Sequence, residues 1–159
     1  MKITVLCVGK IKEKYLREGI AEYSKRLSRY CKLEIIEVAD ERTLDRASEA
    51  EEAQIRCTEG ERLLRLIHPD DYVITLAIQG RMPDSVELSR QIETLGIQGK
   101  SHLVFVIGGS LGLSDEVLNR GNDSVSFSRL TFPHQLMRVI LLEQIYRGYR
   151  IIHHEPYHK

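Results

Sequence analysis

Glycines follow an apolar run in the second half of the chain, at a spacing that exposes the main chain to a ligand. The run ends at Ile107, and Gly108, Gly109 and Gly112 come after it. Because glycine carries no side chain, a bound molecule can lie against the backbone there. In open α/β sheets, ligands bind at the carboxyl ends of strands, where loops and helix N-termini offer free N–H groups. We therefore expect a ligand site among three loops, Leu76 to Pro83, Gly108 to Ser114 and Phe127 to His134.

Several familiar kinds of site do not match these residues. The glycine segment matches neither the P-loop pattern GxxxxGK[ST] nor the dinucleotide pattern GxGxxG. The elbow motif of serine and cysteine hydrolases is also missing. The tail histidines His153, His154 and His158 have no cysteines or acids at zinc-ligand spacing, so we expect them to be exposed. We predict no metal ion in this protein.

Strands and helices are expected to alternate along the chain and so to position the three loops. Apolar runs predict strands at Lys2 to Val8, Leu33 to Val38, Tyr72 to Ile78, His102 to Ile107 and Ser124 to Phe127. Helical spacing and caps predict helices over Leu16 to Leu27, within Asp40 to Ile67, from Asp84 to Leu95, from Ser114 to Arg120 and from Pro133 to Ile152. This alternation predicts one α/β domain over residues 1–159, with a mostly parallel sheet flanked by helices.

The last of these helices is apolar around much of its circumference. One broad arc is formed by Met137, Leu141, Leu142, Ile145, Tyr146 and Tyr149, and it is extended by Leu136, Val139 and Ile140. We do not expect one sheet face to cover both surfaces. The alternative, a helix at the centre of a larger core, demands more chain than 159 residues provide. The pattern therefore predicts a partner chain, most simply in a homodimer.

Charge is unevenly distributed, although the formal net charge is zero. Residues 1–30 carry eight Lys and Arg against three Glu, and residues 129–159 carry five against two. The two basic ends could converge on one face and neutralise phosphates. Ordinary surface solvation explains the same charges equally well.

The N-terminal apolar run and the cysteines indicate where the protein resides. The run from Ile3 to Val8 is too short for a signal-peptide core or a membrane span. Cys7, Cys31 and Cys57 are odd in number and widely spaced, which fits reduced thiols better than disulfides or a metal site. We expect a cytoplasmic protein that makes no membrane contact.

Taken together, the longer motifs resemble the RlmH family of SPOUT methyltransferases. The resemblance covers essentially the whole chain and is carried by Val106 to Gly112, Ser126 to Arg138, Glu143 to Arg147 and the ending Pro156-Tyr157-His158-Lys159. It implies a C-terminal trefoil knot within about residues 72–159, a fold that the general rule against threaded chains would not predict. It also implies a homodimer that methylates N3 of a pseudouridine in 23S ribosomal RNA of the large subunit, with the assembled ribosome as the expected substrate.

The resemblance further implies that S-adenosylmethionine is the cofactor. Position by position, it assigns cofactor contacts to Leu76, Gly108, Phe127, Ser128, Arg129, Leu130, Thr131 and Phe132. Leu76, Leu130 and Phe132 could form an apolar slot for adenine. On this basis we expect a Gly108→Arg side chain to occupy cofactor space.

The implied reaction assigns roles to several polar residues near the end of the chain. Methyl transfer is an in-line displacement that depends on positioning, and the acceptor imide must lose a proton. His134 and His158 are the candidate bases, and Arg138, an arginine on an apolar helix face, is a third catalytic candidate that would meet a phosphate, a carboxylate or the partner chain. Candidate RNA contacts are Arg147, Arg150, Tyr157 and Lys159, with Tyr157 suited to base stacking.

Three positions depart from the family pattern, and two other functions remain open. Ala77 stands where an acidic residue is common, Gly148 lies inside a helix, and His153-His154-Glu155 replaces a tail that often contains glycine. A non-catalytic RNA-binding or ribosome-binding dimer would keep the fold without binding the cofactor. An oxidoreductase of the NAD type would bind a nucleotide instead.

Overall fold

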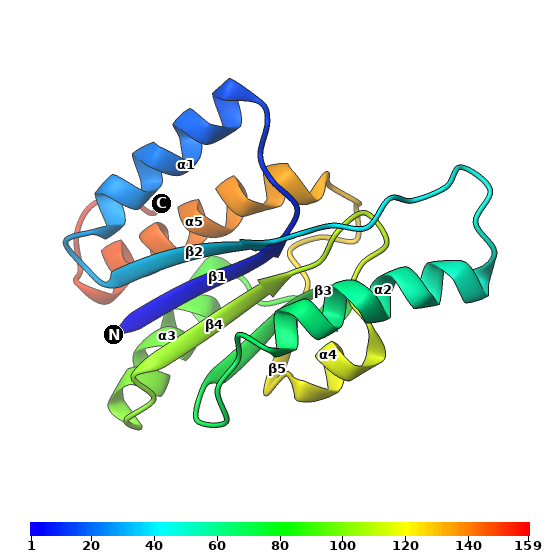
Figure 1. The fold of residues 1–159 in the computed structure, drawn as a ribbon. Helices are drawn as coiled ribbons and strands as arrows, with labels where there is room; N and C mark the ends of the chain where they lie inside the picture. Colours follow the sequence, from blue (N-terminus) through cyan, green and yellow to red (C-terminus); the bar gives the residue numbers. More distant parts are fainter.

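Five parallel strands form the middle layer of the protein (Figure 1). The computed structural model describes residues 1–159, and its strands are β1 (Lys2–Val8), β2 (Lys32–Val38), β3 (Tyr72–Arg81), β4 (His102–Ile107) and β5 (Asp123–Val125). They lie in the order β2-β1-β4-β3-β5, and all neighbouring pairs are parallel. The predicted α/β fold with a parallel sheet is therefore confirmed.

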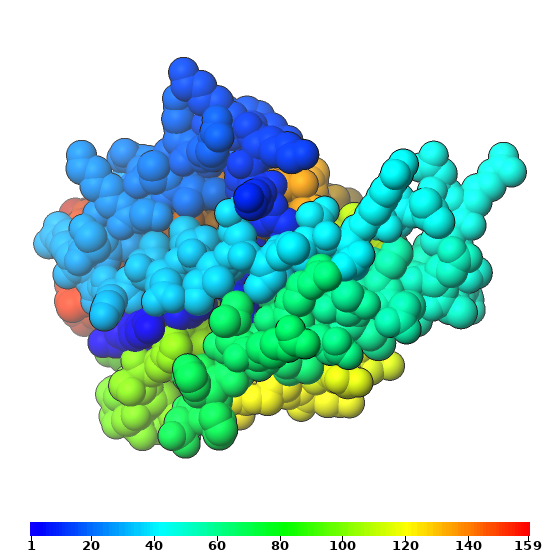
Figure 2. All heavy atoms as spheres, viewed as in Figure 1, coloured from blue at the N-terminus to red at the C-terminus, as the bar shows by residue number.

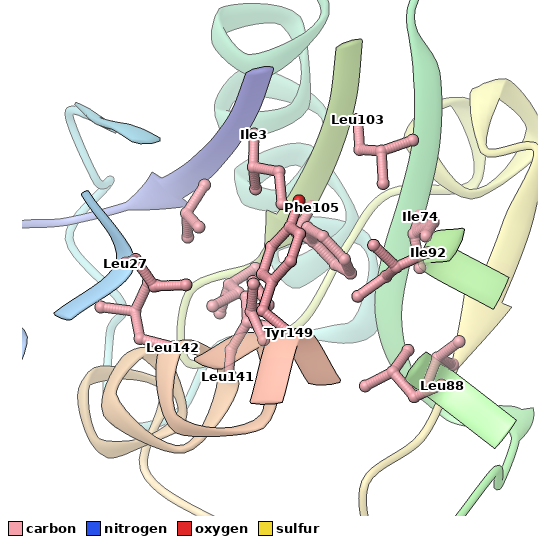
Figure 3. Packing of buried hydrophobic residues seen from close by; sticks show 14 of the residues in the cluster. Ile3, Leu27, Ile74, Leu88, Ile92, Leu103, Phe105, Leu141, Leu142 and Tyr149 are labelled. Carbon is pink, nitrogen blue, oxygen red and sulfur yellow. The ribbon is translucent and has the colours of Figure 1, made fainter. Parts of the chain in front are cut away.

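Helices cover both faces of this sheet. One face carries α1 (Lys14–Leu27), α3 (Ser85–Ile97) and α5 (His134–Ile152), and the other carries α2 (Glu49–Leu64) and α4 (Asp115–Arg120). On the first face, α5 lies between α1 and α3, and Figure 3 shows its Leu141, Leu142 and Tyr149 gathered around Phe105 of β4. Apart from Lys2, Thr4 and His102, the central strands β1 and β4 are apolar, because they are covered on both sides.

Capping boxes determine where two of the helices begin. Asp84 accepts the N–H of Glu87 at 2.8 Å and Glu87 accepts the N–H of Asp84 at 2.7 Å, so the predicted capping box of α3 is confirmed. Ser48 and Glu51 form an equivalent box that the sequence analysis missed. Helix α2 therefore begins only at Glu49, well after Asp40, and the residues before it form an extended strap.

Three predicted boundaries near the loops were wrong. Strand β3 continues to Arg81, but Leu76 and Arg81 both pair with Val125, so residues 77–80 bulge out of the ladder. Strand β5 ends at Val125 instead of Phe127: the Ser126 N–H still bonds to the Arg81 carbonyl at 2.8 Å, but the chain then turns, with the Ser126 hydroxyl donating to the Ser128 carbonyl. Pro133 occupies the N-cap position of α5, so the helix begins one residue later than predicted, at His134.

One chain covers more of α5 than we expected. Flanked by α1 and α3, every residue of this helix is buried or half-buried, including Leu136, Val139 and Ile140. The expectation that a single chain would leave a broad apolar face open was therefore wrong, because α1 and α3 supply walls that the sheet alone does not. The homodimer and the trefoil knot both stay predictions. No helix of the protein is long and apolar enough to cross a membrane.

Candidate functional site

A pocket of about 830 Å³ opens at the carboxyl ends of β3, β4 and β5. It is lined by parts of all three loops that the sequence analysis singled out. Of the predicted cofactor contacts, its lining contains Leu76, Gly108, Phe127, Ser128, Leu130, Thr131 and Phe132. Its volume lies in the range of about 300–1,000 Å³ that small-molecule sites occupy. The strand order thus brings together segments that lie more than fifty residues apart in sequence.

The glycine loop after β4 forms one wall of the pocket by folding tightly on itself. Gly109 and Gly112 form a small antiparallel bridge, and Gly112 adopts a φ of +82°, which other residues rarely accept. A methyl group placed on Gly108 would lie 2.7 Å from the carbonyl carbon of Gly112. Gly108 is therefore required for closure of the loop, and a side chain there would displace the loop itself before reaching the pocket. This changes the reason we gave for the effect of Gly108→Arg.

The segment after β5 forms the facing wall and is shaped by its own hydroxyl groups. The Ser126 hydroxyl donates to the Ser128 carbonyl at 2.9 Å, and the Ser128 hydroxyl accepts the Leu130 N–H at 2.9 Å. These bonds hold the turn open toward the pocket. Leu130 is 71% exposed, which leaves an apolar surface uncovered in the single chain. Arg129 points to solvent and is the one predicted cofactor contact that lies outside the lining.

The pocket also contains residues that the sequence analysis did not assign to the cofactor. The bulge in β3 contributes Ala77, Ile78 and Gln79. The two charged residues of the lining are Arg56 from α2 and Asp115 from α4. In the sequence, Asp115 indicates only an acidic residue that stabilises the first turn of α4. Arg56 lies in the middle of α2 and belongs to no motif. Only the packing of α2 and α4 on the same sheet face places them here.

His134 is the one histidine in the lining, and it lies at the start of α5. Its Nδ1 atom is buried and has no hydrogen-bond partner. Burial, reinforced by the nearby positive charge of Arg138, lowers the pKa of His134 below its ordinary value of 6.5. The ring is therefore neutral near pH 7, and a nitrogen is free to accept a proton.

Arg138 lies one turn further along α5, but its guanidinium points away from the pocket. The side chain is 1% exposed and pairs with Glu37 of β2, with 2.5 Å between Nη1 and Oε2. Its Nη2 donates to the carbonyls of Val8 and Gly9 at 3.1 and 2.7 Å. Of the three partners considered for this arginine, a phosphate, a carboxylate and the partner chain, the structure supplies a carboxylate. These bonds tie the guanidinium to the end of β1. A catalytic role for Arg138 stays a prediction.

The other predicted polar residues lie at the far end of α5. Arg147 pairs with Glu143 and lies over the ring of Tyr157, and it donates from Nη1 to Nδ1 of His158 at 3.1 Å. These residues lie about 20 Å along the helix axis from His134, at 1.5 Å per residue. Within one chain, the structure does not bring His158 to the pocket.

Internal partners also occupy most of the predicted RNA contacts. Arg150 binds Glu155 and the carbonyl of Pro156, and the Tyr157 hydroxyl donates to Glu143 at 3.1 Å. The tail is thereby folded back onto α5. Lys159 alone among the four remains exposed and without an ion pair. The RNA-binding role of these four residues stays a prediction.

S-adenosylmethionine fits the chemistry of this lining. Half of the lining residues are hydrophobic and suit an adenine ring, whereas the main chain of the glycine loop can approach the sugar closely. Arg56 and Asp115 offer opposite charges to the carboxylate and ammonium of the amino-acid end. No group of three or more His, Cys, Asp or Glu side chains is arranged to hold a metal ion.

Comparisons with known proteins agree with this geometry. Residues 1–158 match the family model described as "Predicted SPOUT methyltransferase". The chain is 59% identical to a ribosomal RNA large subunit methyltransferase H of Enterococcus faecalis, 60% to that of Clostridium novyi and 57% to that of Bacillus pumilus, each over 100% of both chains. A solved structure titled a probable methylase family protein, from Haemophilus influenzae, shares the fold with a TM-score of 0.55. It is 11% identical, over 99% of this chain and 70% of that one.

Proposed function

Because the chain belongs to the SPOUT methyltransferase family, we propose that it transfers a methyl group from S-adenosylmethionine to N3 of a pseudouridine in 23S ribosomal RNA of the large subunit. The observation that carries this proposal is the pocket built from three loops, which holds seven of the eight residues expected to contact the cofactor. The full-length identity of 57–60% to enzymes named for methylation of large-subunit ribosomal RNA supports the substrate.

The residues of the pocket would act mainly by positioning. When bound, S-adenosylmethionine supplies an electrophilic methyl group on a positively charged sulfur. Leu76 and Phe132 bind and orient the adenine, and the loop beginning at Gly108 shields the site from water. Holding the acceptor nitrogen and the methyl carbon in line can lower the activation free energy by about 7–11 kcal/mol. No nucleophilic side chain of the enzyme is needed.

We assign to His134 the removal of the proton from the acceptor nitrogen. The N3 imide of pseudouridine must lose its proton before or during attack, and a neutral imidazole is a suitable acceptor near pH 7. His134 lines the pocket, has a buried nitrogen without a partner and has a lowered pKa. The second candidate, His158, lies far from the pocket of its own chain.

The proposal includes a homodimer in the cytoplasm. A second chain would cover the apolar surface left by Leu130 and Ile78, which are 71% and 59% exposed at the mouth of the pocket. It could also bring one chain's tail, including His158, toward the pocket of the other. The substrate we favour is the assembled ribosome.

The test is transfer of labelled methyl from S-adenosylmethionine to ribosomes from cells that lack this gene. We expect incorporation into 23S ribosomal RNA at N3 of one pseudouridine, located by mass spectrometry of digested RNA. Free RNA, isolated large subunits and whole ribosomes should be compared in parallel. Calorimetry separates the other functions, since a pure RNA-binding dimer would not bind S-adenosylmethionine and an oxidoreductase would bind NADH instead.

A further inference from the structure

A run of exposed cations follows β1 and continues into the first turn of α1. We call it the basic segment, and it comprises Lys10, Lys12, Lys14 and Arg17, all exposed. Lys14 has a loose ion pair with Glu18, with 3.7 Å between their charged atoms, and the other three cations form none. Tyr15, in the middle of the segment, is 70% exposed. The segment therefore presents unneutralised positive charge together with an aromatic ring.

The backbone of the basic segment is held in place although its cations are free. Ile11 is only 9% exposed, so Lys10 and Lys12 flank a buried anchor and project to solvent. The Ile11 N–H donates to Glu37 at 3.2 Å, and Glu37 in turn pairs with the buried Arg138 of α5. The segment is thus fixed to the same helix whose first residue, His134, lines the pocket.

The basic segment lies beside the pocket. A methyl group placed on Gly9 would lie 3.6 Å from the His134 ring, so the chain enters the segment directly against the pocket wall. Figure 2 shows the dark-blue residues after β1 next to the orange start of α5. The strap and first turn of α2, residues 40–52, carry six Asp and Glu against two Arg. The charge around this edge of the sheet is therefore asymmetric, with the positive side at α1.

Helix stability does not account for these cations. The first turn of α1 contains no acidic residue, and Glu13 at the N-cap makes no side-chain bond, so its charge alone offsets the unfavourable interaction of Lys14 and Arg17 with the helix dipole. Positive charges at positions where they weaken the helix call for another explanation, and a polyanion bound at this surface supplies one.

We propose that the basic segment binds the phosphate backbone of the RNA substrate next to the nucleotide in the pocket, and that Tyr15 stacks on an unpaired base. The inference rests on the proposed function and adds to it the surface that receives the RNA. Cations on a fixed backbone would position the strand, and an exposed ring suits an unstacked base. A partner that binds this surface would be negatively charged, because Lys10, Lys12 and Arg17 form no ion pair with a carboxylate of this chain.

The test is a triple variant, Lys10→Gln, Lys12→Gln and Arg17→Gln, compared with a control triple, Lys25→Gln, Lys32→Gln and Lys100→Gln. The control residues are also exposed and unpaired, and they change the net charge equally, but they lie at the other edge of the sheet. Methyl transfer to ribosomes from cells lacking the gene is measured between 50 and 200 mM salt. For the first triple, we expect KM for ribosomes to rise about tenfold and the log–log salt slope to fall by about two to three, since each phosphate contact contributes about 0.7–0.9. The kcat and the affinity for S-adenosylmethionine should not change.

Each other outcome is decisive. If the wild-type protein methylates ribosomes and both triples share its KM and salt slope, the basic segment does not bind RNA. If the first triple becomes monomeric by light scattering while the control triple stays dimeric, the surface is an interface between copies of the chain, and our inference is overturned. Should the first triple fold poorly, the single variants Lys10→Gln and Lys12→Gln should each lower the slope by about one. A wild-type protein that transfers no methyl at all would instead refute the proposed function.

Discussion

Arg138 of α5 and Glu37 of β2 form an ion pair in which the arginine is buried and the carboxylate reaches the surface. Their side chains are 1% and 34% exposed, and they join elements 101 residues apart in sequence. The same guanidinium binds two carbonyls at the end of β1, and the same carboxylate binds the N–H of Ile11. One charged pair therefore connects the start of α5, the end of β1 and the basic segment.

Removing one partner of this pair should be strongly destabilising. We expect Arg138→Met to lower the free energy of unfolding by about 2–3 kcal/mol, because two buried carbonyls lose their donor, whereas the carboxylate of Glu37 is one-third exposed and can be solvated. Arg138→Lys should recover only part of the loss, since an ammonium lacks the planar fork. Urea unfolding measures both, with Arg26→Gln, in an exposed pair with Glu22, as a control whose midpoint should hardly move. A wild-type midpoint for Arg138→Met would contradict the structure here.

Activity should depend on the neutral form of His134. Because burial lowers its pKa below 6.5, the base form dominates above that pH and is lost only as the pH falls through the lowered value. The acid limb of kcat should therefore have its midpoint below pH 6.5. His134→Ala should reduce kcat by about 10²–10⁴-fold and abolish this limb, with cofactor affinity retained. His154→Asn, in the exposed tail, is the control. An unchanged acid limb in His134→Ala would remove this residue from the mechanism.

Glu59 should make stability depend on pH in the opposite direction from most carboxylates. It is 4% exposed, its Oε1 has no partner, and burial raises its pKa above the ordinary 4.5. The folded state thus holds the proton more tightly than the unfolded chain, so this stabilising contribution is present below pH 4.5 and declines as the pH rises through the raised value. We expect Glu59→Gln to gain stability relative to wild type as the pH rises from 4 to 8. Thermal melts across that range test this, and parallel curves would show that the carboxyl is not perturbed.

Gly108→Ala should weaken the binding of S-adenosylmethionine. Gly108→Ala would press a methyl group to within 2.7 Å of the Gly112 carbonyl carbon, so the loop must open and affinity for S-adenosylmethionine should fall at least about tenfold. Calorimetry measures this loss directly. An affinity equal to wild type would show that the loop is not part of the cofactor site.

Gly148→Ala serves as the matched control and as a prediction of its own. Its methyl group would meet Ile92 and Ser89 at 3.7 Å, an ordinary contact distance, in the middle of α5. We expect a gain of about 1 kcal/mol in the free energy of unfolding, because alanine favours the helix, and no change in cofactor affinity. A loss of stability would mean that α3 and α5 are packed more tightly than these distances indicate.

Local signals were sufficient for most elements of the fold and for the three loops of the pocket. The apolar runs, the caps at Asp84 and Ser114 and the glycines after Ile107 act over a few residues, so they can be read directly from the chain. The resemblance to a methyltransferase family also came from contiguous motifs, and the match over residues 1–158 confirmed it.

Tertiary structure decided how those loops meet and which polar groups remain free. Strand order places Arg56 and Asp115 in the pocket, and the shared pairing of Val125 pushes Ala77 to Gln79 into it. Arg147 and Arg150, which we expected to contact RNA, instead form ion pairs with Glu143 and Glu155 of the same chain. These outcomes depend on contacts between residues far apart in the chain. Periodicity and spacing describe only near neighbours, so no local pattern could have predicted that Arg138 turns toward Glu37 while His134, one turn earlier, faces the pocket.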